Sequence, residues 1–181
     1  MNIEIAGEVV GINETLYSVE VMRTSGNSDI ILCQTCGNCA EIGDIVHIKG
    51  TIKSTYYKKH LIVYVDVEDL HIMPESIIPT TNKALLNGIV VMKPYMKRST
   101  LNKILICNSM IFTDGRNYIP FIAWGSNAHI LNDMKCGTRI EIEGRFQRRI
   151  YNNGNKHGEA YEVSCYRIEE VNDDDNENMQ N

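Results

Sequence analysis

The sequence contains no long apolar run. No stretch approaches the ~20 consecutive apolar residues that a membrane-spanning helix needs, and the first ten residues lack the basic-then-apolar order of a secretory signal peptide. We therefore expect a cytoplasmic protein that does not associate with membranes. Disorder of the whole chain is excluded as well, because hydrophobic residues make up 43% of the 181 residues.

Catalytic and metal-binding patterns are also missing. The five histidines are scattered singly, and the sequence shows no nucleophile–base constellation, no paired catalytic carboxylates and no phosphate-binding loop. Cys33, Cys36 and Cys39 have a spacing that can ligate zinc or an iron–sulfur cluster, but no fourth ligand lies nearby in the sequence. We expect a protein that is not an enzyme, with no metal, no cofactor and no disulfide.

A basic balance is lacking too, since the formal net charge is −5. Taken as an average, this charge argues against a nucleic-acid partner. The charge is unevenly distributed, however: residues 1–83 carry −5, residues 84–168 carry +6, and residues 169–181 carry −6. The middle segment is therefore a candidate for binding an anionic partner. The alternative is an ordinary solvated surface, because such an excess arises by chance in many domains.

One pattern occurs twice in the chain. Residues 43–57 begin with Gly43 and contain Gly50, and residues 137–151, 94 positions later, begin with Gly137 and contain Gly144. Both stretches alternate between apolar and polar residues and end in tyrosine, which is typical of a strand buried on one face. The internal glycines are where a long strand in a small closed barrel has to bend or bulge.

Alternation and turn residues predict five strands in each half of the chain. We expect them at 2–12, 15–23, 28–35, 44–56 and 60–72, and at 84–93, 102–112, 117–124, 138–151 and 159–170. Helical spacing over 126–134 predicts a short helix between the third and fourth strands of the second half. Five strands with a helix at this point describe an OB-fold, which is a small Greek-key barrel.

The predicted fold class is therefore all-β, with two tandem five-stranded OB-fold barrels. We expect an N-terminal OB-like domain over 1–73, a linker over 74–83 with two prolines, and a second OB-fold over 84–171. Residues 172–181 are acidic, polar and without apolar anchors, so we expect a disordered tail.

The second half resembles the bacterial single-stranded DNA-binding proteins. The resemblance covers about residues 84–171 and rests on an ordered set of positions: Tyr118, Trp124-Gly125, Ala128, Gly137, Gly144-Arg145-Phe146, Arg149 and Tyr151. The layout of two barrels looks like the clostridial or phage type of these proteins. The resemblance implies sequence-nonspecific binding of single-stranded DNA in replication, recombination or repair, and a homo-oligomer.

The same resemblance implies base-stacking roles for Tyr118, Trp124 and Tyr151. Tyr118 and Trp124 are six residues apart on one strand, so they share a face, whereas Phe121 should point into the core. The alternative for Trp124 is a core anchor beside the helix. Tyr95, next to a proline in a basic loop, is a further stacking candidate.

Basic residues form two clusters that border the usual binding face of an OB-fold. The first cluster is the loop after the first strand of the second half, and the second follows the fourth strand. We take as candidate phosphate contacts Lys93, Lys97 and Arg98 in the loop, Arg116 before Tyr118, and Arg145, Arg148 and Arg149 in the strand. Alternation places Arg145 and Arg149 on one face and Arg148 on the other.

The first half lacks an aromatic residue in its third strand, so a structural or self-association role is as plausible as weak DNA binding. The resemblance implies that the acidic tail docks replication or repair proteins. The tail nevertheless ends Met-Gln-Asn and lacks the phenylalanine tip of that family. The alternative function is an OB-fold interaction module that joins a replication complex and has little DNA affinity of its own.

Overall fold

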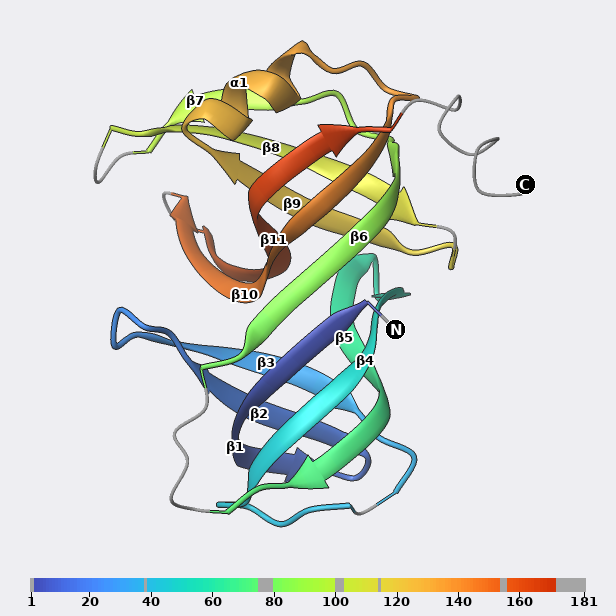
Figure 1. The fold of residues 1–181 in the computed structure, drawn as a ribbon, viewed down its shortest axis with the longest axis vertical. Helices are drawn as coiled ribbons and strands as arrows, with labels where there is room; N and C mark the ends of the chain where they lie inside the picture. The colour runs from blue at the N-terminus through green and yellow to red at the C-terminus, as the bar shows by residue number, and fades with distance from the viewer. Residues whose placement is uncertain are drawn as a thin grey trace, which may run out of the picture. The chain divides into compact units, whose positions relative to one another are not determined.

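The computed structural model describes residues 2–37, 39–74, 80–99, 103–113, 115–153 and 156–171, with only the backbone at 151–153 and 156–157. In this part of the chain the first half consists of five strands. They are β1 (Ile3–Asn13), β2 (Leu16–Met22), β3 (Ser28–Gln34), β4 (Ile45–Tyr57) and β5 (His60–Ile72). Antiparallel pairings join β1 to β2, β2 to β3 and β5 to β4, β3 runs parallel to β5, and β4 returns to β1. The strands therefore close into a five-stranded OB barrel (Figure 1).

The second half repeats this order. Its strands are β6 (Asn82–Val90), β7 (Tyr95–Arg98), β8 (Leu105–Thr113), β9 (Tyr118–Trp124), β10 (Arg139–Asn153) and β11 (Lys156–Glu170), with α1 (Ser126–Asp133) between β9 and β10. The strand order β6-β10-β11-β9-β8, with β8 paired back to β6, closes a second five-stranded ring. The predicted all-β fold with two OB barrels and one short helix is confirmed. The predicted tail, residues 172–181, lies outside the described residues.

The sequence reasoning assigned Tyr95, Lys97 and Arg98 to a loop, and this was wrong. They form the short strand β7, which pairs with the edge of β8 through Tyr95↔Asn108 and Lys97↔Ile106. Four residues are too few to show an alternating pattern, so only the partner strand reveals the pairing.

Contacts within the chain define two compact units. The first unit contains Met1–Ala84 and Arg145–Val163, and the second contains Leu85–Gly144 and Ser164–Asn181. The long strands β10 and β11 are therefore shared, because their hairpin end belongs to the first unit. Within that unit Asn82 at the start of β6 binds Phe146 twice: Asn82 Nδ2 donates to the Phe146 carbonyl at 2.8 Å, and Asn82 Oδ1 accepts from the Phe146 N–H at 2.9 Å.

The internal repeat is reproduced in the hydrogen bonding of the turns before β4 and β10. Gly43 and Gly137 both adopt a positive φ, at 98° and 95°, where glycine carries little strain. The Gly43 N–H donates to the Val9 carbonyl and the Gly137 N–H to the Val90 carbonyl, both at 2.8 Å. Val9 and Val90 are therefore equivalent positions in the two barrels.

A second pair of glycines extends this equivalence to the outer strands. A side chain at Gly7 would collide with the backbone carbonyl of Glu20, and a side chain at Gly88 would collide with that of Phe112. Glu20 on β2 and Phe112 on β8 thus occupy the same place in the two barrels. The predicted bend at Gly50 is also present, since the register of β4 against β5 shifts between Lys49 and Gly50.

Each barrel encloses an apolar core built from the inward positions of its strands. The first is filled mainly by isoleucine and valine, and the second adds Phe121, which is buried as predicted. Helix α1 packs Ala128 and Leu131 inward from its one apolar face. Large fully buried residues of the two cores include Ile5, Val19, Ile31, Ile48, Ile52, Leu86, Ile111, Ile119 and Phe121.

Candidate nucleic-acid interface

The outer side of β7, β8 and β9 forms one continuous surface in the second unit (Figure 1). Alternate residues of a strand point to opposite faces, and the register brings Phe112 opposite Tyr118 and Ile106 opposite Trp124. We call this surface the β7–β9 face. Its members are Tyr95, Lys97, Ile106, Asn108, Met110, Phe112, Tyr118, Pro120, Ile122 and Trp124.

Aromatic rings occupy the two ends of the β7–β9 face. Tyr118 is 40% exposed, and its ring centroid lies 4.9 Å from that of Phe112 with the planes inclined by 46°. This distance is within the range of favourable aromatic pairs. Tyr95 is 64% exposed on the neighbouring strand β7. Exposed rings on a sheet are what a stacking platform for bases requires.

Phe112 was missed by the sequence reasoning, which took its aromatic candidates from the third and fourth strands and the basic loop, and none from the second strand. The residue stands at the end of a predicted strand, and its face could be assigned only from the cross-strand register with Tyr118. Pairing the second and third predicted strands of the second half residue by residue would have placed Phe112 opposite Tyr118.

Trp124 shares the face of Tyr118, as the even spacing predicts, but it is half-buried. Its indole Nε1 donates a hydrogen bond to the hydroxyl of Ser164 on β11 at 3.1 Å. Ile122 and Ile106 beside it are buried. The indole is therefore held in a fixed orientation and is half-buried. This is intermediate between the exposed stacking residue and the core anchor that the sequence left open.

The first basic cluster is only partly aligned with these rings. Lys97 pairs with Ile106 and so points from β7 toward the β7–β9 face, and it is exposed. Arg98 points to the opposite side, and its Nη1 donates to the backbone carbonyl of Lys103 at 3.2 Å. Lys93 precedes β7 and is exposed. Arg116 is exposed in the turn before β9, where its φ is 60°, so strand alternation does not assign it to a face.

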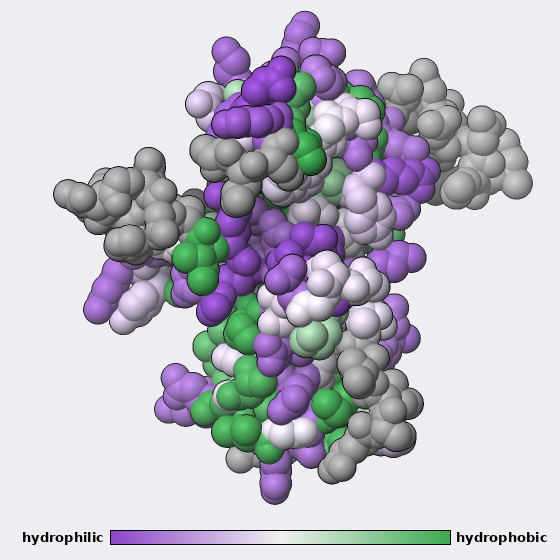
Figure 2. Space-filling view, turned by 90° about the vertical axis from the view of Figure 1, so that its left-hand side faces the viewer, coloured by the Kyte–Doolittle hydropathy of each residue, from purple (hydrophilic) through white to green (hydrophobic). Residues whose placement is uncertain are grey.

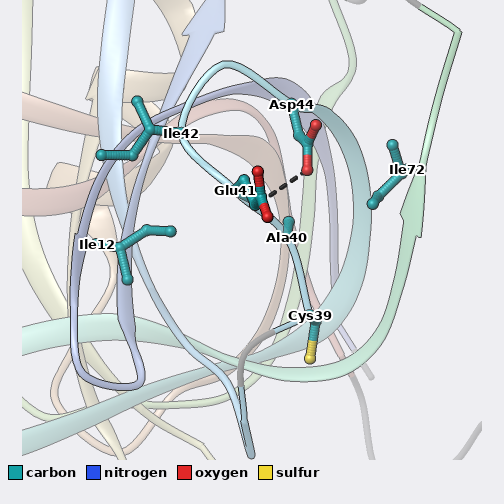
Figure 3. Close-up of a pocket in the computed structure, with 7 residues that line it drawn as sticks. All are labelled: Ile12, Cys39, Ala40, Glu41, Ile42, Asp44 and Ile72. Atoms are coloured by element: carbon teal, nitrogen blue, oxygen red, sulfur yellow. Dashed lines mark hydrogen bonds between the residues drawn. The ribbon is translucent and has the colours of Figure 1, made fainter.

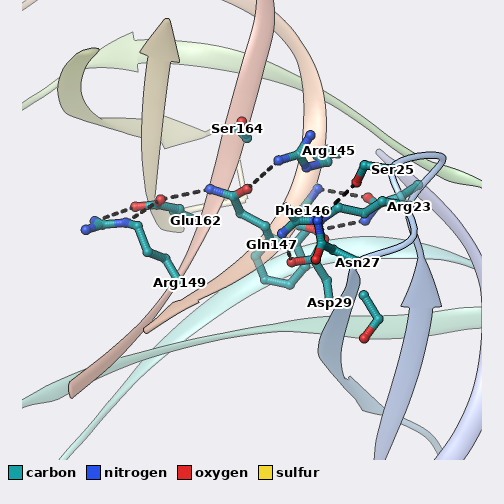
Figure 4. A network of polar contacts seen from close by, with 12 residues as sticks. Arg23, Ser25, Asn27, Asp29, Arg145, Phe146, Gln147, Arg149, Glu162 and Ser164 are labelled. Carbon is teal, nitrogen blue, oxygen red and sulfur yellow. Dashed lines mark hydrogen bonds and ion pairs between the residues drawn. The ribbon is translucent and has the colours of Figure 1, made fainter. Parts of the chain in front are cut away.

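The second basic cluster is held by carboxylates of the same hairpin. Arg149 donates from Nε and Nη2 to the two oxygens of Glu162, at 2.7 and 2.9 Å, and Glu162 is buried. Gln147 Nε2 also donates to Glu162, at 3.0 Å. On the other face Arg148 approaches Glu159 at 3.5 Å. These two arginines are thus charge-paired within the hairpin, and Figure 4 shows the contact of Arg149 with Glu162.

Arg145 lies on the same face as Arg149, as alternation predicts, and is partly buried. Its Nη2 donates to Gln147 Oε1 at 2.9 Å (Figure 4). Its pKa is lowered chiefly because burial penalises the charged form, and the positive charge of Arg23 adds to this effect. Arg23 itself forms an ion pair with the buried Asp29. The side chain of Tyr151 lies outside the described residues.

The described residues contain neither a metal-binding group nor a membrane-spanning helix. No group of three His, Cys, Asp or Glu residues there is arranged to hold a metal ion. No helix there is long and apolar enough to cross a membrane. Burial raises the pKa of the thiols of Cys33 and Cys107, and it raises that of Cys165 to about 12, so these three thiols are protonated at neutral pH.

Comparison with known proteins places this geometry in a familiar fold. No family model matches the sequence, and no curated protein matches it. The chain has the fold of a single-stranded DNA-binding protein. It superposes on the wild-type single-stranded DNA binding protein from Thermus aquaticus with a TM-score of 0.74 at 12% identity, covering 95% of this chain and 93% of that one. A deletion mutant of the same Thermus aquaticus protein gives a TM-score of 0.76 at 13% identity, covering 96% and 95%.

Proposed function

We propose that the protein binds single-stranded DNA without reading its sequence, through the β7–β9 face. The observation that carries this proposal is the exposed Tyr118 ring, paired with the half-buried Phe112 ring, with Tyr95 and Lys97 on the same face. Bases of any identity stack on such rings, and each stack contributes about 1–3 kcal/mol by truncation. The shared fold with the Thermus aquaticus single-stranded DNA binding protein supports the same function.

Phosphate groups are contacted in this proposal mainly by Lys93 and Lys97. Both lysines are exposed, and Lys97 lies on the same side of β7 as Tyr95, two residues along the strand. Arg148 and Arg149 contribute less, because their charges already face Glu159 and Glu162. The affinity for DNA therefore falls as the salt concentration rises. The slope is shallow, because few phosphate contacts release counterions. We also propose Arg145 and Tyr151 on β10 as DNA contacts. Arg98 and Arg116 are proposed contacts at the borders of the β7–β9 face.

In the cell this activity would protect exposed single strands during replication, recombination or repair, without a catalytic step. We further propose a cytoplasmic homo-oligomer and a tail, residues 172–181, that docks replication or repair proteins. These points rest on the family resemblance of the second barrel. They are separable from DNA binding by the β7–β9 face.

The test uses Trp124, the one tryptophan of the chain, as its reporter. Oligo-dT and a duplex of equal length are titrated into the full chain at two salt concentrations while the fluorescence is recorded. We expect quenching by oligo-dT and much weaker binding of the duplex, with the affinity for oligo-dT lower at high salt. Equal affinity for single strands and duplex would contradict the proposal, and would favour the alternative of an interaction module.

A further inference from the structure

The end of the first barrel carries an open pocket that the DNA proposal does not use. It has a volume of about 720 Å³ and is lined by loop 39–44, β1 and β5. We call it the loop 39–44 pocket (Figure 3). In the second barrel the connection between the third and fourth ring strands is helix α1, whereas here a loop covers the same place. The residues lining the pocket are Ile12, Cys39, Ala40, Glu41, Ile42, Asp44 and Ile72.

The loop is held rigidly by side-chain hydrogen bonds. The buried Tyr17 hydroxyl accepts from the Cys39 N–H at 2.9 Å and donates to the Ala40 carbonyl at 3.2 Å. Asp44 Oδ2 accepts from the Glu41 N–H at 2.7 Å. A surface that is already ordered loses little conformational entropy when a partner binds.

This rigid loop presents isoleucine to solvent. Ile42 is 67% exposed and Ile72 is 57% exposed, on the rim of the same pocket as Ile12. Figure 2 shows such hydrophobic areas, coloured green, among hydrophilic surface in purple. Single exposed apolar residues are common, but several that converge on one pocket are typical of an interaction site.

The second barrel has a pocket at the corresponding place, and its lining differs in charge. Its lining includes Lys135 and Thr138, at the repeat positions of Glu41 and Asp44, together with Ile130, Asp133, Met134 and Glu170. The position of Ile42 is taken by Cys136. Both pockets therefore combine carboxylates with apolar side chains, but the lining of the second includes a lysine, whereas the lining of the first includes two carboxylates, three isoleucines and no Lys or Arg.

The charge of the rim indicates the kind of partner. Two carboxylates, Glu41 and Asp44, stand beside the isoleucines, and residues 1–83 carry a net charge of −5. Such a surface repels a phosphate backbone and attracts a cationic group. We propose that the loop 39–44 pocket docks a segment of another protein in which an apolar side chain is flanked by lysine or arginine. The apolar side chain packs among Ile12, Ile42 and Ile72, and the cations face the two carboxylates.

The test selects peptides on the folded full-length chain. A phage-displayed library of random 12-residue peptides is panned on the wild type, with removal of phage that bind Ile42→Asp. We expect enriched sequences with an apolar centre flanked by Lys or Arg. A synthetic copy should bind the wild type at least about tenfold more tightly than Ile42→Asp and more tightly than Glu41→Lys, by fluorescence polarisation. Ile130→Asp, at the pocket of the second barrel, is the matched control and should bind it undiminished.

Two further measurements keep the outcome decisive. Circular dichroism and oligo-dT binding of Ile42→Asp should equal those of the wild type, which separates this proposal from the DNA-binding function. The absence of enrichment, or enrichment of acidic or uncharged peptides, would overturn it. A self-association of the wild type that Ile42→Asp abolishes in sedimentation would also overturn it, because the pocket would then belong to a second copy of the chain.

Discussion

The outer faces of β2–β3 and β8–β9 occupy equivalent places in the two barrels and carry opposite chemistry. In the second barrel Phe112 and Tyr118 stand opposite each other, and in the first the same two positions are Glu20 and Ile30. The Ser28 hydroxyl donates a hydrogen bond to Glu20 Oε1 at 2.5 Å. The carboxylate of Glu20 gives this face a negative charge. One architecture is thus used twice, and the residues on one pair of strands decide which copy can stack bases.

Cationic residues show a similar contrast between two places in the chain. The arginines of β10 face carboxylates of β11, so their charge mainly holds the hairpin together. Lys97 on β7 lies instead on the same face as Tyr95, two residues along the strand. A basic cluster in the sequence therefore need not be a binding cluster, because a nearby strand can supply its counter-charge.

The largest effect is expected from breaking the buried pair of β10 and β11. Arg149→Met removes both hydrogen bonds to Glu162 and leaves a buried carboxylate with only Gln147 as partner. We expect a loss of about 2–3 kcal/mol in the free energy of unfolding. Urea denaturation measures it, and Arg148→Met, which breaks the 3.5 Å ion pair between the half-buried Arg148 and the exposed Glu159, should cost less, about 0.5 kcal/mol. Equal stability of the two variants would refute a structural role for Arg149.

Removal of the exposed ring on β9 is expected to act on binding and not on stability. Tyr118→Ala should weaken oligo-dT binding by about 1–3 kcal/mol, the value of one base stack. The matched variant in the first barrel is Ile30→Ala, which should leave the affinity within about twofold. The measurement is a fluorescence titration in low salt. If both variants lose the same affinity, the two faces do not differ as proposed.

A smaller effect is expected for Lys97 on β7. Lys97→Met should lower the affinity severalfold and reduce the slope of log K against log salt by about 0.7, the value for one phosphate contact on a single strand. Lys135→Met, at an exposed lysine in the turn before β10 that is not among the proposed contacts, is the control. An unchanged slope in Lys97→Met would show that Lys97 does not contact phosphate.

The smallest effect is expected from transferring the aromatic pair to the first barrel. The double variant Glu20→Phe, Ile30→Tyr should raise affinity for long oligo-dT by only about two- to threefold, or about 0.5 kcal/mol. The gain is small because the added rings are surrounded by the acidic first half of the chain. A change of DNA site size by sedimentation would show whether the new rings are used. A fall in affinity would mean that the two faces are not interchangeable.

Much of the fold was accessible from the sequence because its signals are local and repeated. Alternating residues, the glycine pairs and the 94-residue repeat predicted the long strands and the barrel class. Strand β7 was not predicted, since four residues carry too weak a pattern and their pairing depends on β8. The stacking candidate Tyr118 was found by spacing, whereas Phe112 required the register between two strands.

The sequence alone determined the two barrels and the face of Tyr118 and Trp124, because alternation along one strand is a local property. It also placed Arg145 and Arg149 on one face, but it could not show that Glu162 takes up the charge of Arg149. Only the tertiary structure decided which arginines meet carboxylates, which ring lies opposite Tyr118, and that loop 39–44 leaves isoleucines exposed. Each of these depends on residues far apart in the chain, whose pairing arises only when the strands close into a barrel.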